Sequence, residues 1–173
     1  MALVRLAYAD PPYLGCCDKY SHYHPDGRCW DDVETHKVLL ARLASEYDGW
    51  AYSLSSQSLD PLVSLAPSGI RVAAWVKPFA AFKANVRIAY TWEPVFFVPA
   101  RGSSSDGAPV GRDHLAEPIA LRKGLTGAKP DRFCRWVLDL LGYCQGDEVD
   151  DLFPGTGVMG RVVAQGVLPW PST

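Results

Sequence analysis

The pattern of hydrophobic and polar positions along the chain predicts alternating strands and helices. Short apolar runs bounded by Pro, Gly or charged residues are typical of buried strands. Longer segments with apolar residues at helical spacing, opened by Asp or Pro, are typical of helices. These criteria predict strands over 3–9, 49–54, 70–76, 93–98 and 148–153, and helices over 31–47, 59–65, 130–141 and 158–165. Such alternation predicts an α/β fold with a mostly parallel sheet.

Two segments carry no such pattern. Residues 13–30 combine Gly, Pro, three Cys and two His without periodicity. Residues 99–129 contain the run Gly-Ser-Ser-Ser-Asp-Gly-Ala-Pro at 102–109 and show little apolar pattern. Both segments are predicted to be loops. We expect one domain over 1–173, with a substrate-side loop at 14–30, a short flap at 99–128 and a helix–strand–turn–helix unit at 129–165.

Composition narrows the class of protein. A hydrophobic fraction of 48% and a net charge of -2 indicate a globular protein without a broadly basic surface, so a nucleic-acid partner would require a local basic patch. No apolar run approaches the roughly 18 residues of a membrane span, and the N-terminus lacks a signal-peptide pattern. We therefore expect a cytoplasmic protein with no membrane contact. The odd number of cysteines, five, favours free thiols over a disulfide framework.

Two unusual turns directly follow predicted strands. Asp10-Pro11-Pro12-Tyr13 follows the first strand, and two prolines cannot continue a central strand. Gly155 and Gly157 follow the last strand. Ligands of open α/β sheets bind at the carboxyl ends of the strands. We therefore expect both turns to face one site.

Both turns resemble motifs of the DNA amino-methyltransferases, which modify adenine N6 or cytosine N4. The segment Tyr-Ala-Asp-Pro-Pro-Tyr at 8–13 resembles their catalytic signature, and Asp-Leu-Phe-Pro-Gly-Thr-Gly at 151–157 resembles their S-adenosylmethionine loop. Residues 74–78, 92–97 and 128–131 resemble the elements between these motifs. The catalytic signature comes first, as in the permuted beta group. The resemblance covers residues 3–98 and 128–165 and implies a single Rossmann-like methyltransferase domain with a reduced sheet.

The resemblance implies catalytic roles for the first turn. Asp10 and a backbone carbonyl of Pro11 or Pro12 would accept the hydrogens of the exocyclic amine, whose lone pair could then attack the methyl group. The prolines would fix the direction of that carbonyl. Tyr13 would stack on the extruded base.

The second turn would bind S-adenosylmethionine. Asp151 would pair with the methionine ammonium, Phe153 would border the pocket, and Gly155 and Gly157 would let the backbone approach the cofactor. Lys129 would lie near the methionine carboxylate or, alternatively, in solvent at the start of its helix.

Substrate contacts are expected from basic and aromatic residues outside these turns. His22 and His24 would touch the base or its phosphates, unless their loop is plain surface. Lys77 and Arg112 are further substrate candidates, and Arg112 lies in a locally basic flap that is otherwise simply solvated. No metal site is expected, because the spacing of the Cys and His residues at 16–29 matches no familiar zinc knuckle.

The chain departs from the family pattern in two places. The family holds the cofactor ribose with an acidic residue on a strand after the cofactor turn, whereas residues 152–173 contain no Asp or Glu. We expect one of three outcomes. Trp170, a second copy of the chain or another protein covers the adenosine; or cofactor binding is weak; or the protein no longer methylates. The flap at 99–128 also replaces a larger target-recognition module.

The resemblance makes adenine N6 in DNA the leading predicted target, because Asp rather than Ser at the start of the catalytic loop favours adenine in this family. Cytosine N4 and RNA adenine are alternatives within the same chemistry. A different class of function is also open: a catalytically silent homologue that binds nucleic acid or a partner methyltransferase. The last alternative is an enzyme that methylates a small molecule.

Overall fold

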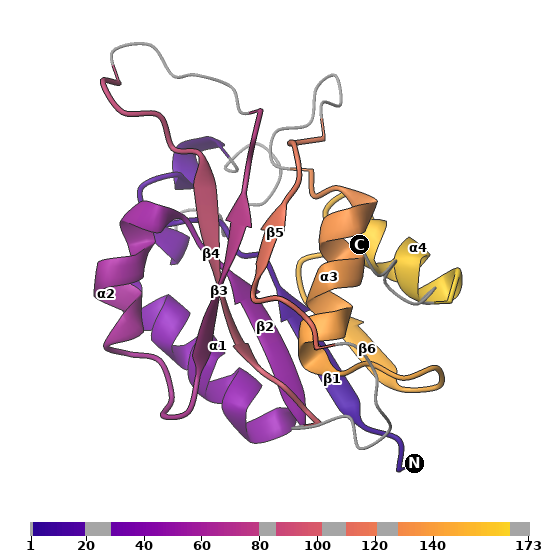
Figure 1. Ribbon diagram of the computed structural model, residues 1–173. Coiled ribbons are helices and arrows are strands. Elements are labelled where there is room, and N and C mark those ends of the chain that lie inside the picture. The colour runs from indigo at the N-terminus through magenta and orange to yellow at the C-terminus, as the bar shows by residue number, and fades with distance from the viewer. Residues whose placement is uncertain (1, 20–28, 80–85, 102–109, 121–127, 167–173) are drawn as a thin grey trace.

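A mixed sheet with the strand order β5-β3-β4-β2-β1-β6 forms the centre of the computed structural model (Figure 1). The structure describes residues 2–19, 29–79, 86–101, 110–120 and 128–166. Strand β4 runs antiparallel to both of its neighbours, and every other neighbouring pair is parallel. The strands are β1 (Arg5–Ala9), β2 (Gly49–Ser53), β3 (Arg71–Val76), β4 (Trp92–Val98), β5 (His114–Ala116) and β6 (Glu148–Asp151).

Helices cover both faces of the sheet. Helices α1 (Val33–Glu46) and α2 (Leu59–Val63) pack on one face, and α3 (Asp131–Leu141) and α4 (Val158–Ala164) on the other (Figure 1). The Asp32 side chain caps α1 by accepting a 3.0 Å hydrogen bond from the backbone N–H of Glu34. Short 3-10 turns span Cys17–Lys19 and Ser56–Ser58.

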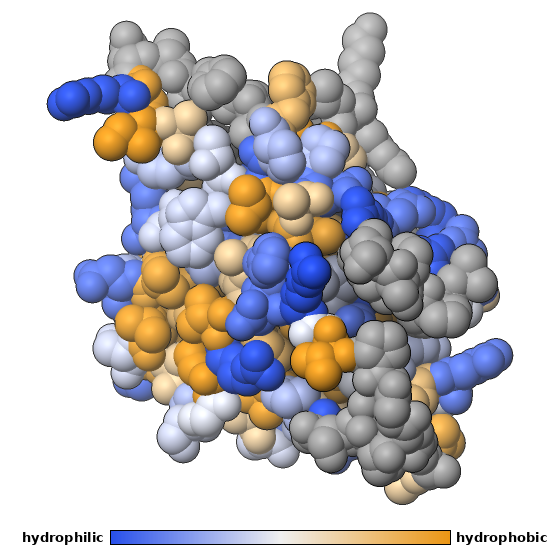
Figure 2. Space-filling view, viewed as in Figure 1, coloured by the Kyte–Doolittle hydropathy of each residue, from blue (hydrophilic) through white to orange (hydrophobic). Residues whose placement is uncertain are grey.

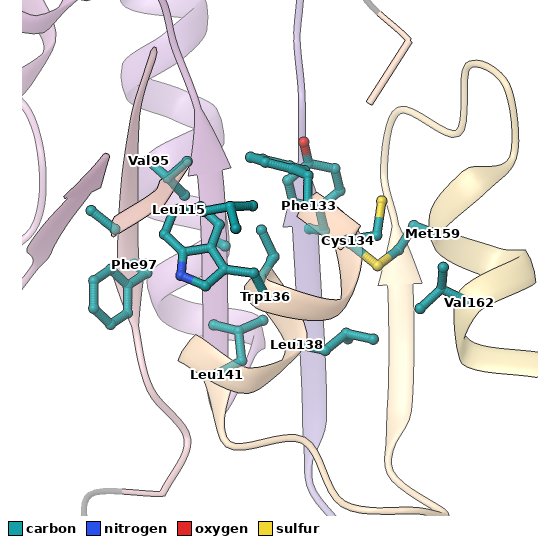
Figure 3. Packing of buried hydrophobic residues seen from close by; sticks show 14 of the residues in the cluster. Val95, Phe97, Leu115, Phe133, Cys134, Trp136, Leu138, Leu141, Met159 and Val162 are labelled. Atoms are coloured by element: carbon teal, nitrogen blue, oxygen red, sulfur yellow. The ribbon is translucent and has the colours of Figure 1, made fainter. Parts of the chain in front are cut away.

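Helix α3 provides most of the helical side of one core cluster. Phe133, Trp136 and Leu141 are fully or nearly fully buried against strand residues such as Val95 and Phe97 (Figure 3). Met159 and Val162 of α4 extend this cluster (Figure 3). The helical spacing of apolar residues in 130–141 therefore reflects one buried face, as the sequence predicts.

One strand was not expected. The sequence predicts a loop throughout 99–129, but β5 lies in this segment and pairs in parallel with Ala74–Val76 of β3. The prediction is wrong here because β5 has three residues, of which Leu115 alone is buried. Three residues are too few to show the alternation by which strands are recognised.

Strand β3 is less completely covered than β2. Every residue of β2 is buried, whereas Val72 and Val76 of β3 are exposed. Hydrophobic residues gather on the α2 side of the face shown in Figure 2, and α2 carries the exposed Val63.

Among the described residues, no helix has the length and apolar character needed to cross a membrane.

A buried ion pair joins the ends of several elements. Asp147, just before β6, accepts bonds from Arg101 Nη1 at 2.6 Å and Nη2 at 2.9 Å, and from the backbone N–H groups of Val4 and Cys144. Its hydrogen bonds to Arg101, outweighing its burial, hold its pKa down at about 2.

Replacing Asp147 with asparagine is expected to destabilise the fold by about 2 to 4 kcal/mol at neutral pH, because Arg101 loses its charged partner in a largely buried site. The depressed pKa of Asp147 means that its contribution is present above pH 4 and is lost as pH falls towards 2. Urea unfolding should therefore give a higher free energy of unfolding for the wild type than for the variant, and this difference should decrease as the pH is lowered. Asp60→Asn, at an exposed position in α2, is the control. An equal loss at all pH values would contradict the role of the charge.

Candidate active site

Neighbouring parallel strands carry the two unusual turns. Strand β1 lies beside β6, with Tyr8 opposite Asp151, and the Leu152 N–H donates to the Tyr8 carbonyl at 2.9 Å. Asp10 follows the end of β1, and Gly155 follows the end of β6. Because both strands run in the same direction, the two turns lie at the same edge of the sheet.

Asp10 presents its two carboxylate oxygens differently. Oδ1 lies 3.1 Å from Lys129 Nζ and accepts a 3.1 Å hydrogen bond from the Tyr13 hydroxyl. Oδ2 has no hydrogen-bond partner among the described residues, and the Asp10 side chain is 21% exposed. One oxygen is therefore held by the protein, and the other is free to accept a hydrogen bond.

Glu93 completes a buried cluster around Asp10. Its Oε2 lies 3.1 Å from Lys129 Nζ and 2.9 Å from the Tyr13 hydroxyl, whose single hydrogen is shared between Glu93 Oε2 and Asp10 Oδ1. The other oxygen, Oε1, pairs with Lys77 Nζ. Strand β4 runs antiparallel to its neighbours, so Glu93 near its start lies at the same edge as Asp10. We call Asp10, Tyr13, Lys77, Glu93 and Lys129 the Asp10 cluster.

The charges of this cluster balance: two carboxylates face two ammonium groups. Burial raises the pKa of Asp10, and Glu93 raises it further against the opposing effect of Lys129. Burial also opposes ionisation of Glu93, but Lys129 and Lys77 outweigh it, so the pKa of Glu93 lies below its ordinary value. Asp10 and Glu93 likewise outweigh burial at Lys129 and raise its pKa. Lys129 is therefore charged at neutral pH.

Tyr13 stays protonated within this cluster. Burial and the charges of Asp10 and Glu93 raise its pKa well above the ordinary range. Its hydroxyl accepts a 2.8 Å bond from Lys129 Nζ, and that ammonium lies 5.4 Å from the ring centroid. The cluster thus fixes the orientation of the Tyr13 ring.

The glycine turn combines an unpaired carboxylate with open space. Asp151 Oδ1 is buried and has no hydrogen-bond partner among the described residues. Burial, together with the charge of Asp10, raises the pKa of Asp151 to about 6, although the Phe153 N–H partly stabilises the anion. Gly155 and Gly157 have φ values of 46° and 67°. A Cβ at Gly157 would meet no atom within 4 Å, so a ligand can approach this backbone closely.

Aromatic residues border the glycine turn on one side. The Phe153 ring packs edge-on against Trp30, with the ring centroids 5.1 Å apart, and Trp30 packs against His36 in the same way. His36 is buried, and its two ring nitrogens bond to the Tyr52 hydroxyl and the Trp30 carbonyl. Trp30 was not among the predicted site residues, because it lies in a segment without periodicity.

The other predicted residues have different locations. Lys77 and Lys129 both belong to the Asp10 cluster. Arg112 is exposed just before β5, at the edge where the parallel strands begin, away from Asp10. His22 and His24 lie outside the described residues. Glu93 was not among the predicted site residues, although a lone carboxylate at the start of an apolar strand was a usable signal.

These features define an α/β protein with a candidate ligand site where its parallel strands end, which is the usual ligand position in open α/β sheets. No protein-family model matches the sequence, and no curated protein matches it. The crystal structure of the M1.HpyAVI–SAM complex is similar: its TM-score is 0.56 at 16% identity, and the match covers 94% of this chain and 78% of that one. The crystal structure of M1.HpyAVI gives a TM-score of 0.57 at 15% identity, over 95% of this chain and 77% of that one. The predicted fold class, a Rossmann-like α/β domain with a mostly parallel sheet, is therefore confirmed.

Proposed function

We propose that this protein is an S-adenosylmethionine-dependent methyltransferase that acts on the exocyclic amine of a nucleic-acid base, with adenine N6 in DNA as the first candidate. The observation that carries the proposal is the juxtaposition of Asp10, with one free carboxylate oxygen, and Asp151, with one unpaired oxygen, at the ends of adjacent parallel strands. The likeness to the M1.HpyAVI–SAM complex supports it through the fold.

The residues of the glycine turn suit the proposed cofactor. The unpaired Asp151 oxygen is suited to an ammonium group, because a buried carboxylate oxygen without a partner is costly. The open space at Gly157 admits a ligand close to the backbone. When bound, S-adenosylmethionine supplies an electrophilic methyl group on a sulfonium.

Asp10 and the proline turn would prepare the nucleophile. The lone pair of an exocyclic amine is delocalised into the ring, so the amine is a poor nucleophile. Asp10 Oδ2 and a backbone carbonyl of Pro11 or Pro12 would accept its two hydrogens and favour a pyramidal nitrogen. Asp10 also stabilises the positive charge that develops on that nitrogen and can accept the proton that it releases. No covalent protein intermediate is required.

A silent homologue is the second candidate. Strand β6 lies at the edge of the described sheet, and residues 152–173 contain no acidic residue for the ribose hydroxyls. If the protein is active, this ligand has to come from outside residues 152–173. Trp170, which the sequence suggested as a cover for the adenosine, lies outside the described residues. A protein that binds nucleic acid without methylating it would need no such ligand.

A methylation assay on defined oligonucleotides tests the proposal. The protein would be incubated with S-adenosylmethionine and single-stranded or double-stranded DNA and RNA, and the nucleosides analysed by mass spectrometry. We expect N6-methyladenine from DNA. N4-methylcytosine or methylated RNA would reassign the substrate, whereas cofactor binding measured by calorimetry with no product on any oligonucleotide would favour the silent homologue.

Replacing Tyr13 with alanine is expected to raise the KM for the oligonucleotide by about 5-fold to 150-fold, because one base–aromatic stack contributes about 1–3 kcal/mol. Tyr13→Phe keeps the ring and should retain most of that affinity. Steady-state kinetics with both variants separates stacking from the hydroxyl contacts with Asp10 and Glu93. An unchanged KM in Tyr13→Ala would show that the ring does not stack on the base.

A further inference from the structure

We propose that Lys129 and Glu93 form a positioning pair that holds one oxygen of Asp10 and the hydroxyl of Tyr13, so that the second Asp10 oxygen alone is presented to the substrate amine. The inference rests on the proposed function, because it assigns Asp10 to the amine. It gives Glu93 a role that the sequence did not suggest, and it gives Lys129 a role other than cofactor binding.

The hydrogen-bond geometry supports this assignment. Lys129 Nζ contacts Asp10 Oδ1 at 3.1 Å, Glu93 Oε2 at 3.1 Å and the Tyr13 hydroxyl at 2.8 Å. An ammonium group has three hydrogens, and these three acceptors use all of them. The Lys129 side chain is 8% exposed, and its ammonium is engaged by these three acceptors.

The surrounding packing keeps the pair in place. Lys129 precedes α3, and its ammonium lies 5.3 Å from the Trp75 ring centroid and 5.6 Å from that of Phe133. Glu93 lies directly opposite Trp75 in the sheet, and Lys77 on the far side holds its other oxygen. The positions of Asp10 and Tyr13 are thereby tied to β3, β4 and α3 as well as to their own loop.

Lys129 and Glu93 have opposite effects on the pKa of Asp10. Lys129 favours the ionised carboxylate, whereas Glu93, a like charge, disfavours it. Removing the Lys129 charge should therefore raise the pKa of Asp10, and removing the Glu93 charge should lower it. Neither substitution removes any of the other titratable groups near Asp10. These are Tyr8 on β1, Tyr13 in the loop, Tyr52 on β2, Cys134 on α3 and Asp151 on β6.

An NMR titration can test this without any substrate. The aspartate carboxyl carbons would be labelled with ¹³C, and the Asp10 signal assigned from its loss in Asp10→Asn. We expect the Asp10 midpoint to move to higher pH in Lys129→Met and to lower pH in Glu93→Gln. Lys37→Met, which removes an exposed lysine paired with Glu34 on α1, is the control and should move nothing. Shifts of the same sign in both site variants, or no shift, would overturn the proposal.

Kinetics supplies a second readout. In Lys129→Met and Glu93→Gln, kcat should fall at least tenfold, while the Kd for S-adenosylmethionine should change less than twofold. In each variant, the acid limb of the pH profile of kcat should shift in the same direction as the titration midpoint of Asp10. Lys129→Arg should recover part of kcat. A weakened cofactor Kd in Lys129→Met with an unmoved Asp10 midpoint would instead place Lys129 in the cofactor site. If Lys129→Met does not fold, the Glu93→Gln titration still decides the result. If the wild type methylates nothing, the proposed function fails while the titration still decides whether the pair controls Asp10.

Discussion

Replacing Asp10 with alanine is expected to lower the rate of methyl transfer by at least about a hundredfold, a loss typical of removing one group that stabilises developing charge. Asp10 Oδ2 is the free acceptor that would orient the amine, and no neighbouring carboxylate can replace it, because both Glu93 oxygens are engaged by lysines. The measurement is a single-turnover methylation assay with the oligonucleotide that the wild type prefers.

Cofactor binding should survive this substitution. Asp10 belongs to the turn after β1, whereas the candidate cofactor residues follow β6. Calorimetry should therefore give a Kd for S-adenosylmethionine within a few-fold of the wild type. Asp60→Ala, at an exposed position in α2, controls for general effects of removing a carboxylate. Parallel loss of binding and of rate in Asp10→Ala would place Asp10 in the cofactor site and contradict its action on the base.

Asp151→Asn is expected to weaken S-adenosylmethionine binding by about thirtyfold or more, since removing one partner of a buried charge pair costs about 2–5 kcal/mol. The buried, unpaired Oδ1 is the atom that would receive the cofactor ammonium. Asp150→Asn is a matched control on the same strand, because the Asp150 carboxylate is already engaged by Arg5 and Tyr47. An unchanged Kd in Asp151→Asn would remove this residue from the cofactor site.

The same substitution should stabilise the protein when no ligand is bound. Burial raises the pKa of Asp151 to about 6, so the folded state binds the proton more tightly than the unfolded state does. Ionised Asp151 therefore costs stability, and this cost develops as pH rises from about 4 to about 6 and is complete at pH 7.

Denaturant unfolding across this pH range would measure the effect. At pH 7 Asp151→Asn should be more stable than the wild type by on the order of 2 kcal/mol, and the difference should disappear below pH 4. Lower stability of the variant at pH 7 would show that the carboxylate already has a stabilising partner. Stabilisation of the empty fold together with weaker binding is the signature of a charge retained for a ligand.

Local patterns in the sequence determined the elements and both turns of this protein. Alternating apolar runs and helical spacings predicted every described strand except β5 and all four described α-helices, although β1 begins at Arg5 and β6 ends at Asp151, each two residues inside the expected range. The prolines after Asp10 and the glycines at 155 and 157 marked the turns, because these residue types restrict or extend the backbone angles wherever they occur.

The tertiary structure alone decided which side chains surround Asp10. Lys129 and Tyr13 are separated by 116 residues, and Glu93 and Tyr13 by 80. They meet because β4 runs antiparallel to its neighbours, which places the start of that strand at the same edge of the sheet as the end of β1, with β2 between them. Strand order and direction depend on how whole elements pack together, and the periodicity within one element does not encode them. For the same reason the short β5 and the contact between Trp30 and Phe153 became visible only in the folded chain.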